Sequence, residues 1–230
     1  LESLPLVAAG TVDGEGRAWA SVLMAPPGFM TGSGSELRLR RAWAPDDPVG
    51  ARLAPGVPLG LLAIDLATRD RLRINTRVAG PLKGDAGFRL RVVERFGNCP
   101  KYIQQRAVSA VAHAAGAPRA AAAAGAAAAL SAAQQALIAG SDTFFLATYH
   151  ADRGADASHR GGRPGFVRVV DDTTLVFPDY AGNGMFNSLG NIATNGRAGL
   201  VFVDWSTHAT LHVSTPKRKE EEEEEEEEKE

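Results

Sequence analysis

The chain has 230 residues, of which 44% are hydrophobic and 23% charged, and this composition is typical of a globular protein. Polar or charged residues interrupt every apolar run before it reaches about 18 residues, so we expect no membrane-spanning helix and no membrane partner. Cys99 is the single cysteine, which excludes an internal disulfide framework and favours a reducing, cytoplasmic location. The N-terminal stretch lacks the basic start and apolar segment of a signal peptide.

The formal net charge of −2 is dominated by the end of the chain. Residues 216–230 contain ten glutamates and four basic residues, and the rest of the chain contains 21 basic and 17 acidic residues. The glutamate run repels itself, so it predicts a solvated acidic tail. The mildly cationic remainder lacks the charge of a dedicated nucleic-acid binder, and we expect no nucleic-acid partner.

Two stretches of the chain repeat each other. The segment that begins at Thr11 matches the segment that begins at Thr148, including a shared Ala-Ser and a shared Pro-Gly-Phe. Further along the chain the offset between the two stretches grows by two residues, and residues 61–75 match residues 200–214. Matches that persist over about seventy residues indicate a tandem duplication.

Each copy alternates apolar and polar residues over short runs that Gly, Pro, Asp and Asn separate, a pattern typical of antiparallel strands. In the first copy the predicted strands are 6–12, 17–23, 36–40, 58–65, 70–79 and 87–95. In the second copy they are 143–149, 155–160, 166–170, 174–178, 198–204 and 209–214, with a short helix at about 184–194. Six strands per copy suggest a small barrel, because closure removes exposed strand edges.

The region between the copies is rich in alanine and favours helix, with Ser131 as the cap of a helix at 132–139. The predicted division of the chain therefore has four parts. These are a degenerate copy at 1–110, an Ala-rich helical linker at 111–140, a second copy at 141–215 and the acidic tail at 216–230.

The second copy contains three clusters that could bind a ligand. Residues 157–169 (ASHRGGRPGFVRV) are basic and rich in glycine, 177–184 (FPDYAGNG) end a strand in a turn, and 185–191 (MFNSLGN) begin the short helix. A helix start presents free N–H groups that can hold a phosphate. Amides and hydroxyls would come from Asn183, Asn187 and Ser188, and charge from Arg160, Arg163 or Arg168. A side-chain-capped helix without a ligand explains the same residues equally well.

The order and spacing of five motifs decide between these readings. DTFFLAT (142–148), SHRGGRPGFVRV (158–169), LVFPDYAGN (175–183), FNSLGN (186–191) and GLVFVDW (199–205) resemble the pyridoxamine 5′-phosphate oxidase-related, FMN-binding split-barrel family. More narrowly, they are similar to its members with SHRGG and NSLGN motifs. The resemblance covers residues 130 to 214. The first copy resembles the family more weakly, although its GNCPKYIQ segment also occurs there.

The resemblance implies a mainly β fold of two tandem split β-barrels, each six-stranded, antiparallel and of Greek-key type, with short helices. It implies FMN at the interface between two barrels, either in a homodimer or in an intramolecular pseudo-dimer. By motif, Ser158, His159, Arg160 and Gly161 would line the flavin, and Phe177, Pro178 and Asp179 would run beside its ring and ribityl chain. The residues near the phosphate would be Asn183, Asn187, Ser188 and Asn191.

This sequence departs from the family pattern at several motifs, so some properties of the family are not implied for this chain. The Ser-Arg-Lys phosphate grip and the substrate-binding features of the true oxidases are not recognisable, so vitamin B6 oxidation is not implied. The first copy has lost the SHRGG and Asn-Ser-Leu motifs, and we expect it to supply a wall of the flavin site rather than a second site.

Other reactive residues fit structural roles better. Cys99 lies near Lys101 but lacks the histidine or carboxylate of a nucleophile, so we expect it to be structural or close to the cofactor. The five histidines show no metal-ligand spacing, and we expect no metal. Asp65 and Asp204 recur at one position of the repeat, which predicts hairpin turns. The tryptophans are expected in cores or interfaces, although one from the first copy could stack on the flavin.

The resulting prediction is an FMN-dependent oxidoreductase that acts on an unidentified small molecule, with NAD(P)H as the candidate reductant. Arg160 or His159 could supply positive charge near the flavin N1–C2 edge. No residue is identified as a catalytic acid or base. The alternative is a flavin- or haem-binding module without turnover.

Overall fold

The structure is a computed structural model that describes residues 1–84, 86–97, 99–107, 127–182 and 184–215. The acidic tail and most of the Ala-rich linker lie outside these residues. The described part is mainly β, with helices α1 (Ala132–Gly140) and α2 (Asn187–Asn195) and one 3-10 turn, η1 (Gly50–Arg52). We refer to residues 1–107 as the N-terminal half and to residues 127–215 as the C-terminal half.

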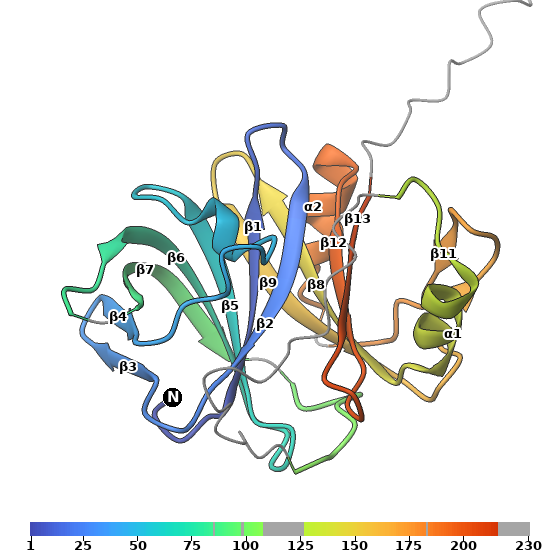
Figure 1. Cartoon of the computed structure of the whole chain (residues 1–230), viewed down its shortest axis with the longest axis horizontal. Coiled ribbons are helices and arrows are strands. Elements are labelled where there is room, and N and C mark those ends of the chain that lie inside the picture. Colours follow the sequence, from blue (N-terminus) through green and yellow to red (C-terminus); the bar gives the residue numbers. More distant parts are fainter. Residues whose placement is uncertain (85, 98, 108–126, 183, 216–230) are drawn as a thin grey trace, which may run out of the picture.

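The N-terminal half forms one antiparallel sheet with the strand order β2-β1-β5-β6-β7-β4-β3 (Figure 1). Its strands are β1 (Leu6–Val12), β2 (Ala18–Met24), β3 (Met30–Ser33), β4 (Glu36–Leu39), β5 (Pro58–Ile64), β6 (Arg71–Pro81) and β7 (Phe88–Gly97). Six of these strands were predicted. The sequence MTGS of β3 was missed because it is short and contains neither alternation nor a β-rich run.

The C-terminal half has a four-stranded sheet with the order β13-β12-β8-β9 and a separate two-stranded ribbon. The sheet contains β8 (Thr143–His150), β9 (Gly154–Gly161), β12 (Gly199–Val203) and β13 (Thr210–Ser214), and the ribbon contains β10 (Arg168–Val169) and β11 (Leu175–Val176). Ser131 caps α1 in a capping box with Gln134, which confirms the predicted helix start. The main sheets are open, which agrees with a split-barrel-like fold, and two closed tandem barrels stay a prediction.

The strand pairings of the two halves follow the sequence repeat. The order β2-β1-β5-β6 in one half corresponds to β9-β8-β12-β13 in the other. Val7 pairs with Ala63, and the residues aligned with them, Phe144 and Phe202, also pair. This agreement supports the tandem duplication.

The hairpin turns of the repeat agree as well. In the turn after β5, Asp65 accepts two backbone N–H bonds, and Asp204 does the same after β12. Arg69 and His208 occupy matching positions of these turns with φ values of 65° and 61°. The predicted turn role of the two aspartates is confirmed.

Side chains alternate between two cores along the central strands. In β8, Phe144 and Leu146 belong to the core of the C-terminal half, whereas Phe145 and Ala147 belong to a central cluster that both halves share. In β1, Leu6 and Ala8 face this central cluster and the intervening residues face the core of the N-terminal half. The two sheets therefore pack face to face, and their central strands are apolar on both faces.

Two glycines allow the sheets to approach closely. A Cβ atom on Gly60 of β5 would lie 2.6 Å from Asp156 Cα in β9, and a Cβ atom on Gly199 of β12 would collide with Ala18 in β2. Gly60 aligns with Gly199, and Ala18 aligns with Ala155 beside Asp156. The halves are therefore related by an approximate two-fold arrangement.

We expect the substitution Gly60→Ala to lower the free energy of unfolding by about 1–3 kcal/mol, because the added methyl group overlaps the backbone of β9. Urea unfolding followed by circular dichroism measures this change. Gly14→Ala is the matched control, since its Cβ would meet nothing within 4 Å. Equal stabilities of the two variants would contradict the close packing of the sheets.

Candidate functional site

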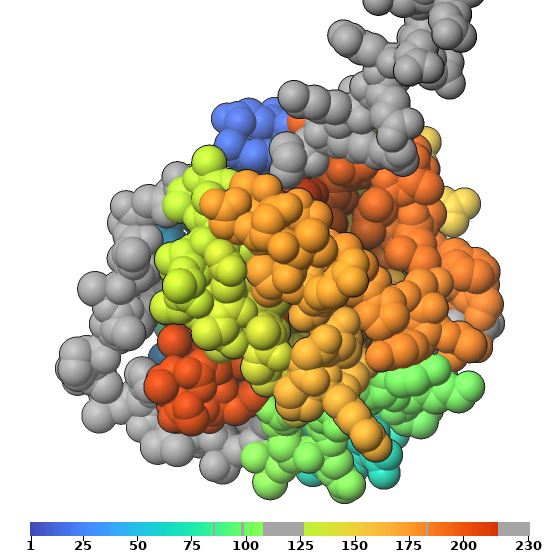
Figure 2. Space-filling model, turned by 90° about the vertical axis from the view of Figure 1, so that its right-hand side faces the viewer, coloured from blue at the N-terminus to red at the C-terminus, as the bar shows by residue number. Residues whose placement is uncertain are grey.

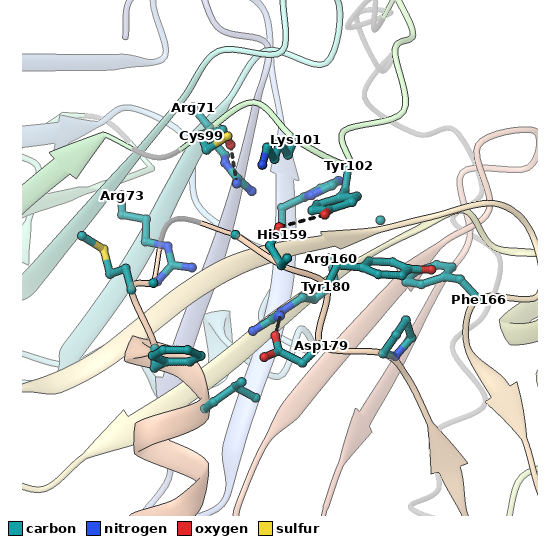
Figure 3. A pocket seen from close by; sticks show the side chains of 18 residues that line it. Arg71, Arg73, Cys99, Lys101, Tyr102, His159, Arg160, Phe166, Asp179 and Tyr180 are labelled. Carbon is teal, nitrogen blue, oxygen red and sulfur yellow. Dashed lines mark hydrogen bonds and ion pairs between the residues drawn. The ribbon is translucent and has the colours of Figure 1, made fainter.

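A pocket lies at the edge of the contact between the two halves. The N-terminal half contributes β6 and the segment after β7, and the C-terminal half contributes β9 and the segment between β11 and α2. Figure 2 shows the green segment after β7 against the orange residues of the C-terminal half. Figure 3 shows side chains from both halves pointing into the space between them.

The structure brings some predicted ligand residues together and separates others from the pocket. The residues His159, Arg160, Gly161, Pro178 and Asp179 line it. Their roles toward a ligand stay predictions.

Five other predicted residues do not line the pocket. Ser158 and Ser188 are buried and hydrogen-bonded to each other. Phe177 packs edge-on against Phe144 in the C-terminal core, and Asn191 donates to Thr148. Asn187 is half-buried at the start of α2, and Asn183 lies outside the described residues.

Cationic side chains that the sequence analysis missed enter the pocket from the N-terminal half. Arg71 and Arg73 project from the same face of β6, and Lys101 follows β7 (Figure 3). Arg71 donates to the Cys99 carbonyl oxygen, and no acidic partner of Arg71 or Lys101 occurs in the described part of the chain. Arg160 of β9 is paired with Asp179 at 3.2 Å. The pocket therefore carries positive charge that its own carboxylates do not balance.

A buried ion pair joins the halves beside the pocket. Arg73 Nη1 lies 3.0 Å from Asp156 Oδ2, and both side chains are almost fully buried. Ser188 donates to the same carboxylate oxygen at 3.1 Å. Burial raises the pKa of Asp156 and lowers that of Arg73, and each charge opposes the effect of burial on the other.

His159 is a neutral imidazole in this environment. Its side chain is 5% exposed, and neither ring nitrogen has a hydrogen-bond partner among the described residues. Burial, with a smaller contribution from Arg71, Arg106 and Arg160, lowers the pKa of His159 to about 3. The prediction that His159 could supply positive charge is therefore wrong, and Arg160 is the cation at this position of β9.

Aromatic rings form the outer part of the pocket. Tyr102 stacks on Tyr180 with ring centroids 4.8 Å apart, and the Tyr102 hydroxyl donates to the Ala181 carbonyl oxygen at 2.8 Å. These contacts join the two halves at the pocket entrance. Phe186 also lines the pocket and is 63% exposed. Exposed rings of this kind can stack on a planar ligand.

The tryptophans lie elsewhere. Arg52 stacks on Trp19 and Arg106 on Trp205, and Trp43 is buried in the N-terminal core. None of the three lines the pocket, so the predicted stacking of a tryptophan on a flavin there is not supported.

The first turn of α2 borders the pocket through Phe186 and Leu189. Phe186 occupies the N-cap position, and no side chain there caps the helix. The side-chain cap of the ligand-free alternative is therefore not found among the described residues, and binding of an anion by the N–H groups of the first turn stays a prediction.

Two further properties bear on the kind of site. Within the described ranges, no group of three or more His, Cys, Asp or Glu residues is arranged to hold a metal ion. Neither helix in the described part of the chain is long and apolar enough to cross a membrane.

The fold and the site together define a mainly β, split-barrel-like protein with a cationic pocket that exposed aromatic rings also line. Residues 130–230 match the family model described as pyridoxamine 5′-phosphate oxidase. The match covers the C-terminal half and supports the resemblance drawn from its motifs. No curated protein and no solved structure matched the chain.

The pKa of His159 predicts a pH dependence of stability. Because the folded-state pKa of about 3 lies below the ordinary value of 6.5, the unfolded chain binds this proton more readily. The contribution of His159 to stability is therefore present above about pH 6.5 and is lost as the pH falls toward 3. Urea unfolding across this range should show a weaker pH dependence for His159→Leu than for the wild type. If the free energy of unfolding varied with pH equally in His159→Leu and the wild type, the buried neutral state of His159 would be contradicted.

Proposed function

We propose that the protein binds FMN in the pocket between its halves and acts as a flavin-dependent oxidoreductase on an unidentified small molecule. The observation that carries the proposal is the combination of unbalanced positive charge and exposed aromatic rings in one pocket. The matched family commonly binds flavin, and this supports FMN over other planar anions.

The residues present fit an FMN molecule. Its phosphate needs cations without acidic partners, and Arg71 and Lys101 meet this requirement. Its ring needs aromatic surface, which Tyr102, Tyr180 and Phe186 offer. The unpartnered nitrogens of His159 supply hydrogen-bonding capacity on the inner wall. The cavity measures about 190 Å³, below the roughly 300–1,000 Å³ typical of ligand sites, so part of the ligand would lie in the open entrance.

The bound flavin would supply the electron-transfer chemistry, and the protein would supply binding, orientation and charge. Arg71 and Lys101 would hold the phosphate, and the aromatic side chains would fix the plane of the ring. Arg160 is paired with Asp179 at this wall, so it adds hydrogen-bond donors there rather than unbalanced positive charge. We assign no catalytic acid or base, because His159 is neutral and has no hydrogen-bond partner within the described residues.

We also propose that the two halves form an intramolecular pseudo-dimer with one flavin site. We call the two-fold-related edge of the contact, where β13 meets β2, the second cleft; apolar residues stand there at two positions that are polar in the pocket. Val22 stands where the pocket has His159, and Leu23 stands where it has Arg160. The N-terminal half would thus serve as the wall of a single site, as its lost motifs predict.

A binding module without turnover is the second candidate. The observation that favours it is the neutral state of His159, which leaves the described pocket without an identified acid or base. The absorbance spectrum of the purified protein separates flavin from haem by flavin bands or a haem Soret band. Loss of the flavin absorbance on anaerobic addition of NADPH or NADH would support the oxidoreductase, and a stable spectrum would support the module.

The variant Arg71→Met tests the placement of the phosphate. Removal of this half-buried cation should weaken FMN binding about tenfold or more and leave riboflavin, which has no phosphate, nearly unaffected. Quenching of flavin fluorescence measures both affinities. Arg77→Met on the same strand is the matched control, because Arg77 lies outside the pocket. Equal losses for FMN and riboflavin would contradict this placement.

A further inference from the structure

The ion pair between Arg73 and Asp156 occurs in only one of the two clefts. Arg73 pairs along the sheet with Leu62, and the residue in the matching register, His212, pairs with Val201. Asp156 lies opposite Thr148 in its sheet. In the other half, Thr11 matches Thr148, and the residue opposite Thr11 is Trp19. The matching residues of the second cleft are therefore His212 and Trp19, which carry no carboxylate.

The second cleft shows that the halves can be joined without this pair. There, His212 Nδ1 donates to the Ala20 carbonyl oxygen at 2.8 Å, and Ser214 donates to the Ala18 carbonyl oxygen at 2.9 Å. These hydrogen bonds hold β13 against β2 without an ion pair. A buried ion pair is a costly substitute, because both charges must leave water. Its restriction to the cleft with the pocket therefore indicates a role beyond docking of the halves.

The hydrogen bonding of the pair is asymmetric. Ser188 and Arg73 both bind Asp156 Oδ2, which fixes the carboxylate from the C-terminal half. Arg73 lines the pocket, whereas Asp156 does not (Figure 3). Arg73 Nε has no partner in the described part of the chain, and its side chain is about nine-tenths buried. The guanidinium is thus held from behind by Asp156 and has donor capacity left for a ligand.

We propose that Asp156 is a positioning residue that holds Arg73, across the contact between the halves, as a hydrogen-bond donor to the uncharged part of the flavin. This inference rests on the proposed function. Because Asp156 neutralises Arg73, this guanidinium suits ring or ribityl acceptors, whereas Arg71 and Lys101 suit the phosphate. The site is then complete only when the two halves are docked, since the donor and the group that orients it come from different halves.

A double-mutant cycle in flavin affinity tests the inference. Arg73→Met should weaken FMN and riboflavin binding by the same factor, at least about tenfold, because both ligands share the uncharged part. Asp156→Asn should also weaken both. In the Arg73→Met background, Asp156→Asn should cause no further loss, because Asp156 acts through Arg73. His212→Ala, the matching position of the second cleft, should lower stability and leave both affinities unchanged.

Thermal unfolding and circular dichroism accompany each titration, since Asp156→Asn leaves a buried cation without its partner. If Asp156→Asn does not fold, Asp156→Glu takes its place as the single variant. The double variant of Arg73→Met and Asp156→Asn remains usable, because it removes both charges and leaves no unpaired charge buried. Additive losses of affinity, or a loss of stability with unchanged affinity, would overturn the positioning role and leave the proposed function intact. A wild-type protein that binds no flavin would overturn both.

Discussion

The central apolar contact between the two sheets is the constraint on which the rest of the structure depends. Strands β1, β5, β8 and β12 carry apolar residues on both faces, so each sheet needs a second layer that solvent cannot provide. The other half supplies that layer. Gly60 and Gly199 set the separation of the sheets at two related points, because any larger residue would meet a backbone. The halves consequently behave as one packed unit.

The properties of the pocket follow from its place at the edge of this contact. Side chains there are desolvated enough to change their chemistry, as the neutral His159 and the paired Arg73 and Asp156 show. They also remain close enough to the entrance to meet a ligand. The approximate two-fold arrangement relates two such edges, and within the described residues the buried ion pair between Arg73 and Asp156 occurs at one of them, whereas His212 and Ser214 contact β2 at the other. The two edges therefore differ in the chemistry they offer to a ligand.

Sequence reasoning predicted the scaffold well, because the signals involved are local. The alternation of the strands, the Ser131 cap and the Asp65 and Asp204 turns depend on neighbouring residues, and the structure confirms them. The short strand β3 lacked such a signal. The paired strands of the two halves also agree with the repeat, since register is determined by which face is apolar.

The site was only partly predictable, because half of it comes from residues distant in sequence. The SHRGG motif located His159 and Arg160, but Arg71, Arg73 and Lys101 belong to the half without recognisable motifs. One signal could have found the two arginines. They occupy alternate positions of β6, and Arg73 lies opposite the buried Leu62, where a charge is unexpected in a plain scaffold strand. The neutral state of His159 depends on burial, which the sequence does not reveal.

The number of FMN molecules bound per chain shows how many of the two clefts hold a ligand site. Titration of the ligand-free protein with FMN by calorimetry, with the molar mass of the complex measured by light scattering, gives this number. We expect one FMN per chain, bound in the pocket that contains Arg71 and Lys101. Two per chain would show that the second cleft also binds, and one per two chains would show that the site needs a second copy; either result, or no binding, would contradict it.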